Sequence, residues 1–386
     1  IGAVLMVAAR IVTPAEALAA VDFPTIVLLL GMMLVVGNLR LSGFFERSGE
    51  LTVTRLGKQH LLPAIIFTTG VLSAFLVNDI VCLVMVPFVL NVTRRLGLPP
   101  LRYLLAVATA SNIGSVATIT GNPQNMLIGS YSGIHYRDFL VHLGPVALAG
   151  LFLNWLILHL SRGLDRVAPP LPVAPPQPWA RSPFAAGGLM TETTEEVRYP
   201  NILPKTALVV AAVLAGFLAG ISPALVAALG AAFLLVTRTV EPKRVYEEVD
   251  WGLLVFFVGL FVIVAGAEYS GLTATLLGVA SSAGLHHSAV FAGTTAVLSN
   301  IVSNVPAVML LKGIVPGSPD PHSSWLLLAM ASTLAGNLTI TGSIANIIVV
   351  ERAKGEVQIG FWDYFRVGLP VTLATLVFGW LWLTYL

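Results

Sequence analysis

Charged residues are scarce in this chain of 386 residues: 10% are Asp, Glu, Lys or Arg, and 56% are hydrophobic. A soluble domain carries roughly 25% charged residues, so this chain cannot cover a water-facing surface and needs lipid to solvate it. The net charge of +2 is too small to indicate a nucleic-acid partner. Composition therefore predicts a membrane protein.

Cysteines, nucleotide-binding loops and catalytic pairs are also missing. Cys82 is the one cysteine, which excludes an intramolecular disulfide and a cysteine metal cluster. No GxxxxGK[ST] loop occurs, so nothing in the sequence indicates an ATP-hydrolysing motor. The apolar segments hold no paired carboxylates and no nucleophile with an adjacent base, so we expect neither an enzyme nor a cofactor. Transport would have to be driven by an ion gradient.

Apolar runs that can cross a bilayer recur along the chain, since a spanning helix needs about 20 such residues. We predict spans at 23–43, 139–160, 251–268 and 362–386, two shorter spans within 206–237, and an N-terminal span within 1–20. The first residue is Ile1 rather than Met, so we expect residues to be missing before it.

Other apolar segments are too short to cross. The apolar run after Asn78-Asp79 is eleven residues long, which as a helix reaches only about 16 Å. We therefore predict a re-entrant hairpin at 61–90, with its tip at Asn78-Asp79. The same pattern predicts a second hairpin at 288–315, with its tip at Asn304.

Two longer segments, 101–134 and 325–350, are interrupted by Gly and Asn, and the first also by Pro123. We predict helices that break at membrane depth within 111–125 and 332–346. Backbone freed from a helix is tolerated in a membrane only where it is buried in protein or lines a wet cavity. Two hairpins and two broken helices therefore predict one polar site inside the protein.

The two halves of the sequence repeat each other. The sequence TITG occurs at 118–121 and again at 339–342, and VD occurs at 21–22 and 249–250. Matched repeats with broken helices in corresponding positions are typical of secondary transporters. We predict three parts, which are a first repeat at 1–162, a Pro-rich linker at 163–204 and a second repeat at 205–386.

Charge predicts the orientation. Sixteen of the 21 Lys and Arg residues fall in the loops 44–60, 91–102, 161–205, 238–250 and 351–361. The positive-inside rule makes that side cytoplasmic, so the first hairpin enters from the cytoplasm and the second from outside. We therefore predict an all-α polytopic protein of the bacterial or archaeal inner membrane, with inverted repeats and a cytoplasmic linker.

Polar residues gather at the two breaks and the two tips. Amides and hydroxyls donate and accept hydrogen bonds, so they can replace the hydration shell of a small polar solute. The same residues also serve as ordinary contacts between membrane helices, but the repeat symmetry favours binding. We expect the binding residues to be Asn78, Ser111, Asn112, Thr118, Thr120, Gly121, Asn122, Gln124, Asn125, Ser303, Asn304, Asn337, Thr339, Thr341, Gly342 and Asn346.

Asp79 is the carboxylate that this topology places deep in the membrane. An ionisable group there is costly and is a functional candidate by default. We expect Asp79 to carry the coupling proton or bind the coupling sodium ion. The alternative is that Asp79 only caps the second hairpin helix, because Asp is a good N-cap residue.

Three pieces of sequence carry a family resemblance: SNIG at 111–114, TGNPQN at 120–125, and Asn78-Asp79 followed by Pro87. With these, nearly the whole chain resembles the ion transporter superfamily, which contains arsenite permeases of the ArsB type, NhaD-type sodium/proton antiporters, divalent anion/sodium symporters and citrate transporters. The resemblance implies a scaffold domain, a moving transport domain and a homodimer. Association with an ATPase subunit stays open.

The tips resemble the arsenite permeases more than the dicarboxylate symporters, which usually show Ser-Asn-Thr at both tips. Arsenite is a neutral trihydroxide at pH 7, which suits a pocket of amides and hydroxyls. The leading hypothesis is proton-coupled efflux of arsenite and antimonite by alternating access. The alternatives are a sodium/proton antiporter or a sodium-coupled anion transporter of the same fold, and a channel.

Overall fold

The computed structural model describes residues 1–45, 47, 57–161, 163–164, 199–237, 240–271, 278 and 284–385. Within those ranges every regular element is a helix. Most of the predicted linker, 163–204, lies outside the described residues, and its last residues already belong to the next helix.

The first repeat forms α1 (Gly2–Ala8), α2 (Pro14–Ala19), α3 (Phe23–Leu41), α5 (Leu61–Phe75), α6 (Asn78–Leu96), α7 (Leu101–Ser115), α8 (Pro123–Ser132) and α9 (Tyr136–Leu160). The second repeat forms α10 (Leu203–Leu218), α11 (Pro223–Val236), α12 (Pro242–Glu247), α13 (Trp251–Tyr269), α15 (Ser288–Val302), α16 (Asn304–Leu311), α17 (Pro321–Ala335), α18 (Ile344–Ala353) and α19 (Phe361–Tyr385). Short 3₁₀ turns lie at Lys58–His60, Ile119–Gly121, Pro200–Ile202, Val315–Gly317 and Ile340–Gly342.

The helices α3, α9, α13 and α19 are long and apolar enough to cross a membrane, which confirms four predicted spans. The segment 206–237 holds two shorter apolar helices, α10 and α11, as predicted. Residues 1–20, for which we expected one span, instead form two short helices. The chain turns at Arg10, whose φ is +57°, and Thr13 then caps α2 through a reciprocal capping box with Glu16, so a new helix starts there.

Each predicted hairpin is a pair of helices that meet at a short break. The first breaks at Leu76-Val77, and α6 then continues to Leu96 rather than ending at residue 90, because Gly97 in the left-handed conformation terminates it. The second breaks at Ser303, whose φ is +76°. The tip of the first hairpin lies beside the break after α7, where the Thr118 hydroxyl donates to the carbonyl of Ala74.

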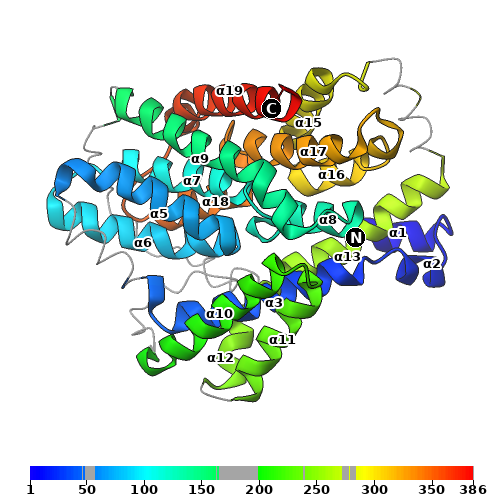
Figure 1. Cartoon of the computed structure of the whole chain (residues 1–386), viewed down its shortest axis with the longest axis horizontal. Coiled ribbons are helices and arrows are strands. Elements are labelled where there is room, and N and C mark those ends of the chain that lie inside the picture. Colours follow the sequence, from blue (N-terminus) through cyan, green and yellow to red (C-terminus); the bar gives the residue numbers. More distant parts are fainter. Residues whose placement is uncertain are drawn as a thin grey trace, which may run out of the picture.

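Both long segments break where the sequence predicts. The first segment breaks between α7 and α8, and the second breaks between α17 and α18. Each gap contains a 3₁₀ turn. The tip of the first hairpin lies beside the break between α7 and α8, midway along a crossing segment. The hairpin therefore enters and leaves on one side. Figure 1 shows α5, α6 and α7 on one side of this midpoint, and α15, α16 and α17 on the opposite side.

The two repeats are therefore inverted. We call the end where α5 and α7 begin the first-hairpin end, and the end where α15 and α17 begin the second-hairpin end. The second broken helix runs from one to the other, since Glu356, just beyond α18, lies 2.5 Å from Arg94 at the end of α6.

The helices also divide into two bundles, and each bundle uses both repeats. One bundle contains α1–α3 with α10–α13, and the other contains the hairpins and broken helices, α5–α9 with α15–α19 (Figure 1). They meet mainly where α3 contacts α8, α10 contacts α9 and α13 contacts α16. We call the second group the hairpin bundle. The polar segments lie inside it and against α13.

Candidate functional site

The first break is held by an amide that pairs with the chain's own carbonyls. Asn125 donates from its side-chain nitrogen to the carbonyls of Ser115, at 3.1 Å, and Thr118, at 3.0 Å. Asn122 caps α8 by accepting from the Asn125 backbone at 2.9 Å. Gly121 is packed so closely that an added Cβ would lie 2.2 Å from the Ser115 carbonyl oxygen, which only glycine tolerates.

The second break repeats this arrangement. Asn346 donates to the carbonyls of Gly336, at 2.6 Å, and Thr339, at 3.0 Å. An added Cβ at Gly342 would lie 2.9 Å from the Gly336 carbonyl oxygen. Buried carbonyls need partners, so Asn125 and Asn346 satisfy backbone that the breaks set free. Their donors are used within the protein.

Asn112 joins the first broken helix to the second. Its nitrogen donates to Asn337 at 3.0 Å and to Asn346 at 2.9 Å. Its oxygen accepts from Asn78 at 3.3 Å and from the Ser343 hydroxyl at 2.9 Å. The four bonds use the full capacity of a buried amide nitrogen and oxygen, so Asn112 fixes the breaks relative to each other.

Thr333 makes the matching connection from the second broken helix to the first. Its hydroxyl accepts from Asn122 and Gln124, each at 3.2 Å, and donates to Asn125 at 3.4 Å. Thr333 stands at the position of the second repeat that corresponds to Asn112. Sequence reasoning missed it, although the alignment of the repeats was a signal that pointed to it.

A cavity of about 330 Å³ lies where the tips and the breaks meet α13. The lining comes from the tips at Asn78-Asp79 and Ser303–Val305, from the starts of α8 and α18 at Pro123-Gln124 and Ser343-Ile344, and from Asp250, Gly252, Leu253, Phe256 and Phe257 at the start of α13. Both hairpin tips therefore face one space, together with the other bundle.

Two carboxylates give the cavity its charge. Asp79 and Asp250 line it from different bundles, and the described lining residues include no Lys, Arg or His. Asp79 has no hydrogen-bond or ion-pair partner among the residues that the structure describes. No side chain caps α6, whose N-cap residue is Val77, so capping does not account for Asp79.

The helix N-termini offset part of this negative charge. The helices α6, α8, α13, α16 and α18 all begin at the cavity, and each N-terminus carries roughly half a positive charge. With both carboxylates ionised, the cavity is therefore close to electrically balanced. Such a site accommodates a small neutral polar solute better than a multiply charged one.

Two amides at the tips differ in how they are used. The side-chain oxygen of Asn78 is buried and has no hydrogen-bond partner among the described residues. Asn304 reaches back to the second break when its nitrogen faces inward, donating to the carbonyls of Ser332 at 3.0 Å and Gly342 at 3.3 Å. Asn78 therefore keeps an acceptor free beside the cavity.

The structure places the predicted site residues in three groups. Five line the cavity: Asn78, Asp79, Gln124, Ser303 and Asn304. Six more lie in the hydrogen-bonded network of the breaks and first tip, namely Ser111, Asn112, Asn122, Asn125, Asn337 and Asn346. The last six lie in the segments that leave the helices at the breaks, namely Thr118, Thr120, Gly121, Thr339, Thr341 and Gly342. Asp250, Phe256 and Phe257 were not predicted to face the site, because α13 contributes them from the other bundle.

The second-hairpin end is closed by a smaller contact between the bundles. Lys312, just after α16, lies 3.5 Å from Glu268 of α13. Its ammonium also lies 4.4 Å from the centre of the Tyr131 ring at the end of α8. These groups line a cavity of about 130 Å³. This end is therefore bridged by charge, while the main cavity lies nearer the start of α13.

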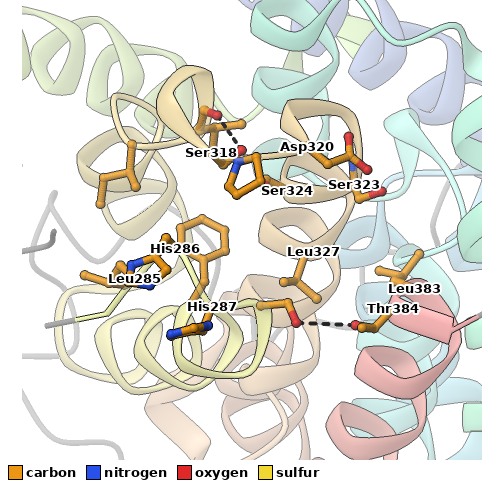
Figure 2. Close-up of a pocket in the computed structure, with 15 residues that line it drawn as sticks. Leu285, His286, His287, Ser318, Asp320, Ser323, Ser324, Leu327, Leu383 and Thr384 are labelled. Carbon is orange, nitrogen blue, oxygen red and sulfur yellow. Dashed lines mark hydrogen bonds between the residues drawn. The ribbon is translucent and has the colours of Figure 1, made fainter.

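Another cavity of about 330 Å³ lies at the second-hairpin end, between the starts of α15 and α17 and the end of α19 (Figure 2). His286, His287 and Asp320 lie around it, but the Asp320 carboxylate already accepts from the Ser323 backbone at 3.2 Å. It is remote from the breaks and tips. Its lining shares no residue with that of the main cavity.

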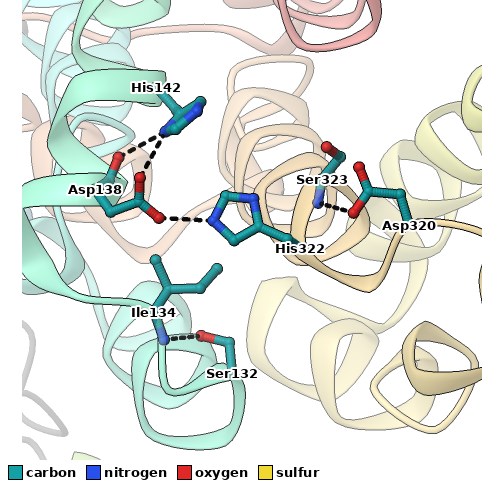
Figure 3. Close-up of polar contacts among 7 residues, drawn as sticks. All are labelled: Ser132, Ile134, Asp138, His142, Asp320, His322 and Ser323. Carbon is teal, nitrogen blue, oxygen red and sulfur yellow. Dashed lines mark hydrogen bonds and ion pairs between the residues drawn. The ribbon is translucent and has the colours of Figure 1, made fainter.

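A histidine cluster joins the two repeats within the hairpin bundle. Figure 3 shows the Asp138 carboxylate between His322, at 2.6 Å, and His142, at 3.2 Å. The cluster connects α9 to the start of α17, so it links two helices of one bundle. It lies apart from the main cavity and does not line it.

The model of the citrate transporter family, CitMHS, matches residues 1–335. The chain is 33% identical to an uncharacterized transporter of Mycobacterium tuberculosis, over 95% of this chain and 87% of that one. It is 32% identical to the silicon efflux transporter LSI3 of Oryza sativa, over 98% and 90%, and 25% identical to a Dictyostelium discoideum protein that carries the name arsB, over 98% and 85%.

A solved structure has the same fold. The YdaH transporter of Alcanivorax borkumensis superimposes with a TM-score of 0.60, over 93% of this chain and 83% of that chain. The sequences are only 17% identical, so this likeness concerns the arrangement of helices alone.

Proposed function

This chain belongs to the citrate transporter family, whose model matches residues 1–335. We propose that it exports arsenite and antimonite in exchange for protons. As a member of that family it is a multi-pass secondary transporter. The proposal adds the solute, the coupling ion and the direction of transport.

The charge of the cavity carries the proposal. Its described lining has two carboxylates and no basic side chain, so no side chain there can pair with the charges of a dianion or trianion such as citrate. Arsenite is a neutral trihydroxide at pH 7, and its hydroxyls can donate to carboxylates and amide oxygens. The helix N-termini keep the site near electrical balance, which also favours a neutral solute.

The named relatives support a solute of this class. LSI3 is named for silicon efflux, and silicic acid is also a small neutral hydroxide. The Dictyostelium protein carries the name arsB. A cavity built for one neutral hydroxide suits another by size and by hydrogen bonding, so silicic acid is the second candidate solute.

Asp79 is the proposed coupling residue. It lines the cavity without a partner among the described residues, and an unpaired ionisable group inside a membrane is a functional candidate by default. A proton on Asp79 and a bound solute would occupy the same cavity in turn. Such competition couples the two flows in opposite directions.

Alternating access would come from movement of the hairpin bundle against the other bundle. The two are joined by few helix pairs, whereas each is tightly connected within itself. We propose that the first-hairpin end faces the cytoplasm of a bacterial or archaeal cell, with the linker on that side, because 16 of the 21 basic residues fall in its loops. A homodimer and an associated ATPase subunit remain predictions.

Everted membrane vesicles test the proposal. Vesicles with and without the protein are given arsenite, antimonite, silicic acid, sodium or citrate, with and without an acid-inside pH gradient. We expect gradient-driven, saturable accumulation of arsenite and antimonite. Accumulation of citrate or sodium without arsenite would overturn the proposal, and unsaturable flux that ignores the gradient would indicate a channel.

A further inference from the structure

Asp250 is the second carboxylate of the cavity, and it belongs to the bundle opposite Asp79. It immediately precedes α13, and one of its oxygens accepts from the Leu253 backbone at 2.9 Å. The other oxygen has no partner among the described residues. Each carboxylate oxygen can accept more than one hydrogen bond, so capping α13 leaves Asp250 able to bind something else.

The matching position in the first repeat gives a comparison within the same chain. Asp22 precedes α3 as Asp250 precedes α13, and it accepts from the Thr25 hydroxyl. Asp22 is not part of the described lining of the main cavity. A carboxylate at the start of this helix is therefore common to both repeats, but in this arrangement only the one in the second repeat faces the solute site.

Three groups at the cavity are acceptors without a partner among the described residues, beside the Ser303 hydroxyl, which can also donate. They are the Asp79 carboxylate, the second oxygen of Asp250 and the side-chain oxygen of Asn78. These acceptors favour a solute that supplies hydrogen-bond donors, as a trihydroxide does and a carboxylate anion does not. A solute that donates to Asp79 and Asp250 at once also touches both bundles.

We propose that Asp250 selects the solute. Its carboxylate accepts a hydrogen bond from a hydroxyl of the neutral hydroxide, and its negative charge disfavours the binding of anions. The inference rests on the proposed function and assigns a specificity-determining residue to that site. Its role differs from that of Asp79, which carries the coupling proton. Removal of Asp250 should alter which solutes enter while leaving the coupling intact.

Electrostatics gives the direction of the change. Five helix N-termini face the two carboxylates, and each contributes roughly half a positive charge. Loss of the Asp250 charge makes the cavity net positive. The cavity then attracts an anion and offers one acceptor fewer to a neutral hydroxide.

The variant Asp250→Asn isolates this charge. Asn has the same size and is an equally good N-cap, so α13 keeps its start and the melting temperature should match that of the wild type. We expect the KM for arsenite to rise about tenfold, as for loss of a hydrogen bond to a charged group. Arsenate and citrate uptake should become measurable, and accumulation should still follow the pH gradient.

Asp22→Asn is the matched control, because it makes the same change at the same repeat position away from the cavity. It should keep the wild-type KM and selectivity. An Asp250→Asn variant with wild-type KM and selectivity would reduce Asp250 to a helix cap and overturn the inference. Equal changes in both variants would also overturn it.

The same assay distinguishes failure of the inference from failure of the proposed function. Wild-type vesicles that accumulate citrate and not arsenite overturn the function, and this inference with it. Wild-type vesicles that accumulate arsenite, together with an unchanged Asp250→Asn variant, leave the function standing and overturn the inference alone.

Discussion

The two repeats have the same hydrogen bonds at their breaks but different residues at their tips. At each break an asparagine, Asn125 or Asn346, donates to two carbonyls that the interrupted helix leaves free. At the tips, Asn78 is followed by Asp79, whereas Asn304 is followed by Val305. What the halves share satisfies the backbone, and what differs gives the cavity its chemistry.

The comparison separates two roles that look alike in the sequence. Asparagines at symmetric positions suggest a symmetric binding site. The side-chain nitrogens of Asn125 and Asn346, however, donate to carbonyls of the protein itself. The groups that stay free, such as Asp79 and the oxygen of Asn78, belong to the first repeat or, like Asp250, have no counterpart in the lining. The acceptors without partners therefore lie where the repeats depart from symmetry.

The largest effect should come from removing a shared feature. Asn125→Ala and Asn346→Ala each remove a side-chain donor from two buried carbonyls, which costs about 2 kcal/mol or more. We expect both variants to lose thermal stability by a similar amount, measured as the melting temperature of the purified protein in detergent.

A donor-free replacement of the same shape controls for the lost volume. Asn125→Leu keeps the branched shape of the side chain but cannot donate, so it should be about as unstable as Asn125→Ala. A stable Asn346→Ala beside an unstable Asn125→Ala would break the comparison, since the two breaks would then rely on different contacts.

The next effect concerns the tip that differs. Asp79→Asn keeps the shape of the side chain and removes the titratable group, so the variant should bind and exchange arsenite yet lose gradient-driven accumulation. Vesicle accumulation is measured with and without the pH gradient. Asp363→Asn, a carboxylate change at the exposed start of α19, should leave accumulation unchanged.

Moving the carboxylate to the other tip sharpens the result. Val305 lines the same cavity, so adding Val305→Asp to Asp79→Asn should restore part of the gradient-driven accumulation. An Asp79→Asn variant that still accumulates arsenite with the wild-type pH dependence would remove Asp79 from the coupling step.

The sequence predicted most of the architecture because length and composition are local. An apolar run that is too short, followed by Asn78-Asp79, already requires a hairpin, and Gly121 and Gly342 already mark the breaks. The end of α6 was predicted too early, because the helix continues through polar residues as far as Gly97. The pattern of apolar residues does not indicate where a helix that continues into polar sequence ends.

The site was harder to predict because it depends on which groups face each other. Nothing in the sequence reveals that the side-chain nitrogen of Asn125 already donates to the carbonyls of Ser115 and Thr118. Asp250 reaches the cavity only because α13 packs against the hairpin bundle. Hydrogen-bond partners and contacts between bundles are tertiary facts that residue spacing does not encode.

The smallest effect should come from another departure from symmetry, at the end of the second hairpin. Lys312 reaches Glu268 and the Tyr131 ring across the bundle boundary, whereas the corresponding residue of the first hairpin is Val86. A partly exposed ion pair is worth about 0.2–1 kcal/mol, and a cation–π contact adds about 0.5–1 kcal/mol. Removal of both should therefore loosen the second-hairpin end without unfolding the protein.

Cysteine accessibility measures that loosening. In a Cys82→Ala background, a cysteine at Ala265, which lines the small cavity beside Lys312, reports access from the second-hairpin end. Lys312→Gln should raise its labelling rate by an impermeant maleimide about threefold, within the range that these contact energies allow. Lys312→Arg should keep the slow rate, and so should Lys354→Gln, whose ion pair with Glu351 lies within the hairpin bundle. Unchanged labelling in Lys312→Gln would mean that apolar packing between α13 and α16 closes this end, and the charge would then be incidental.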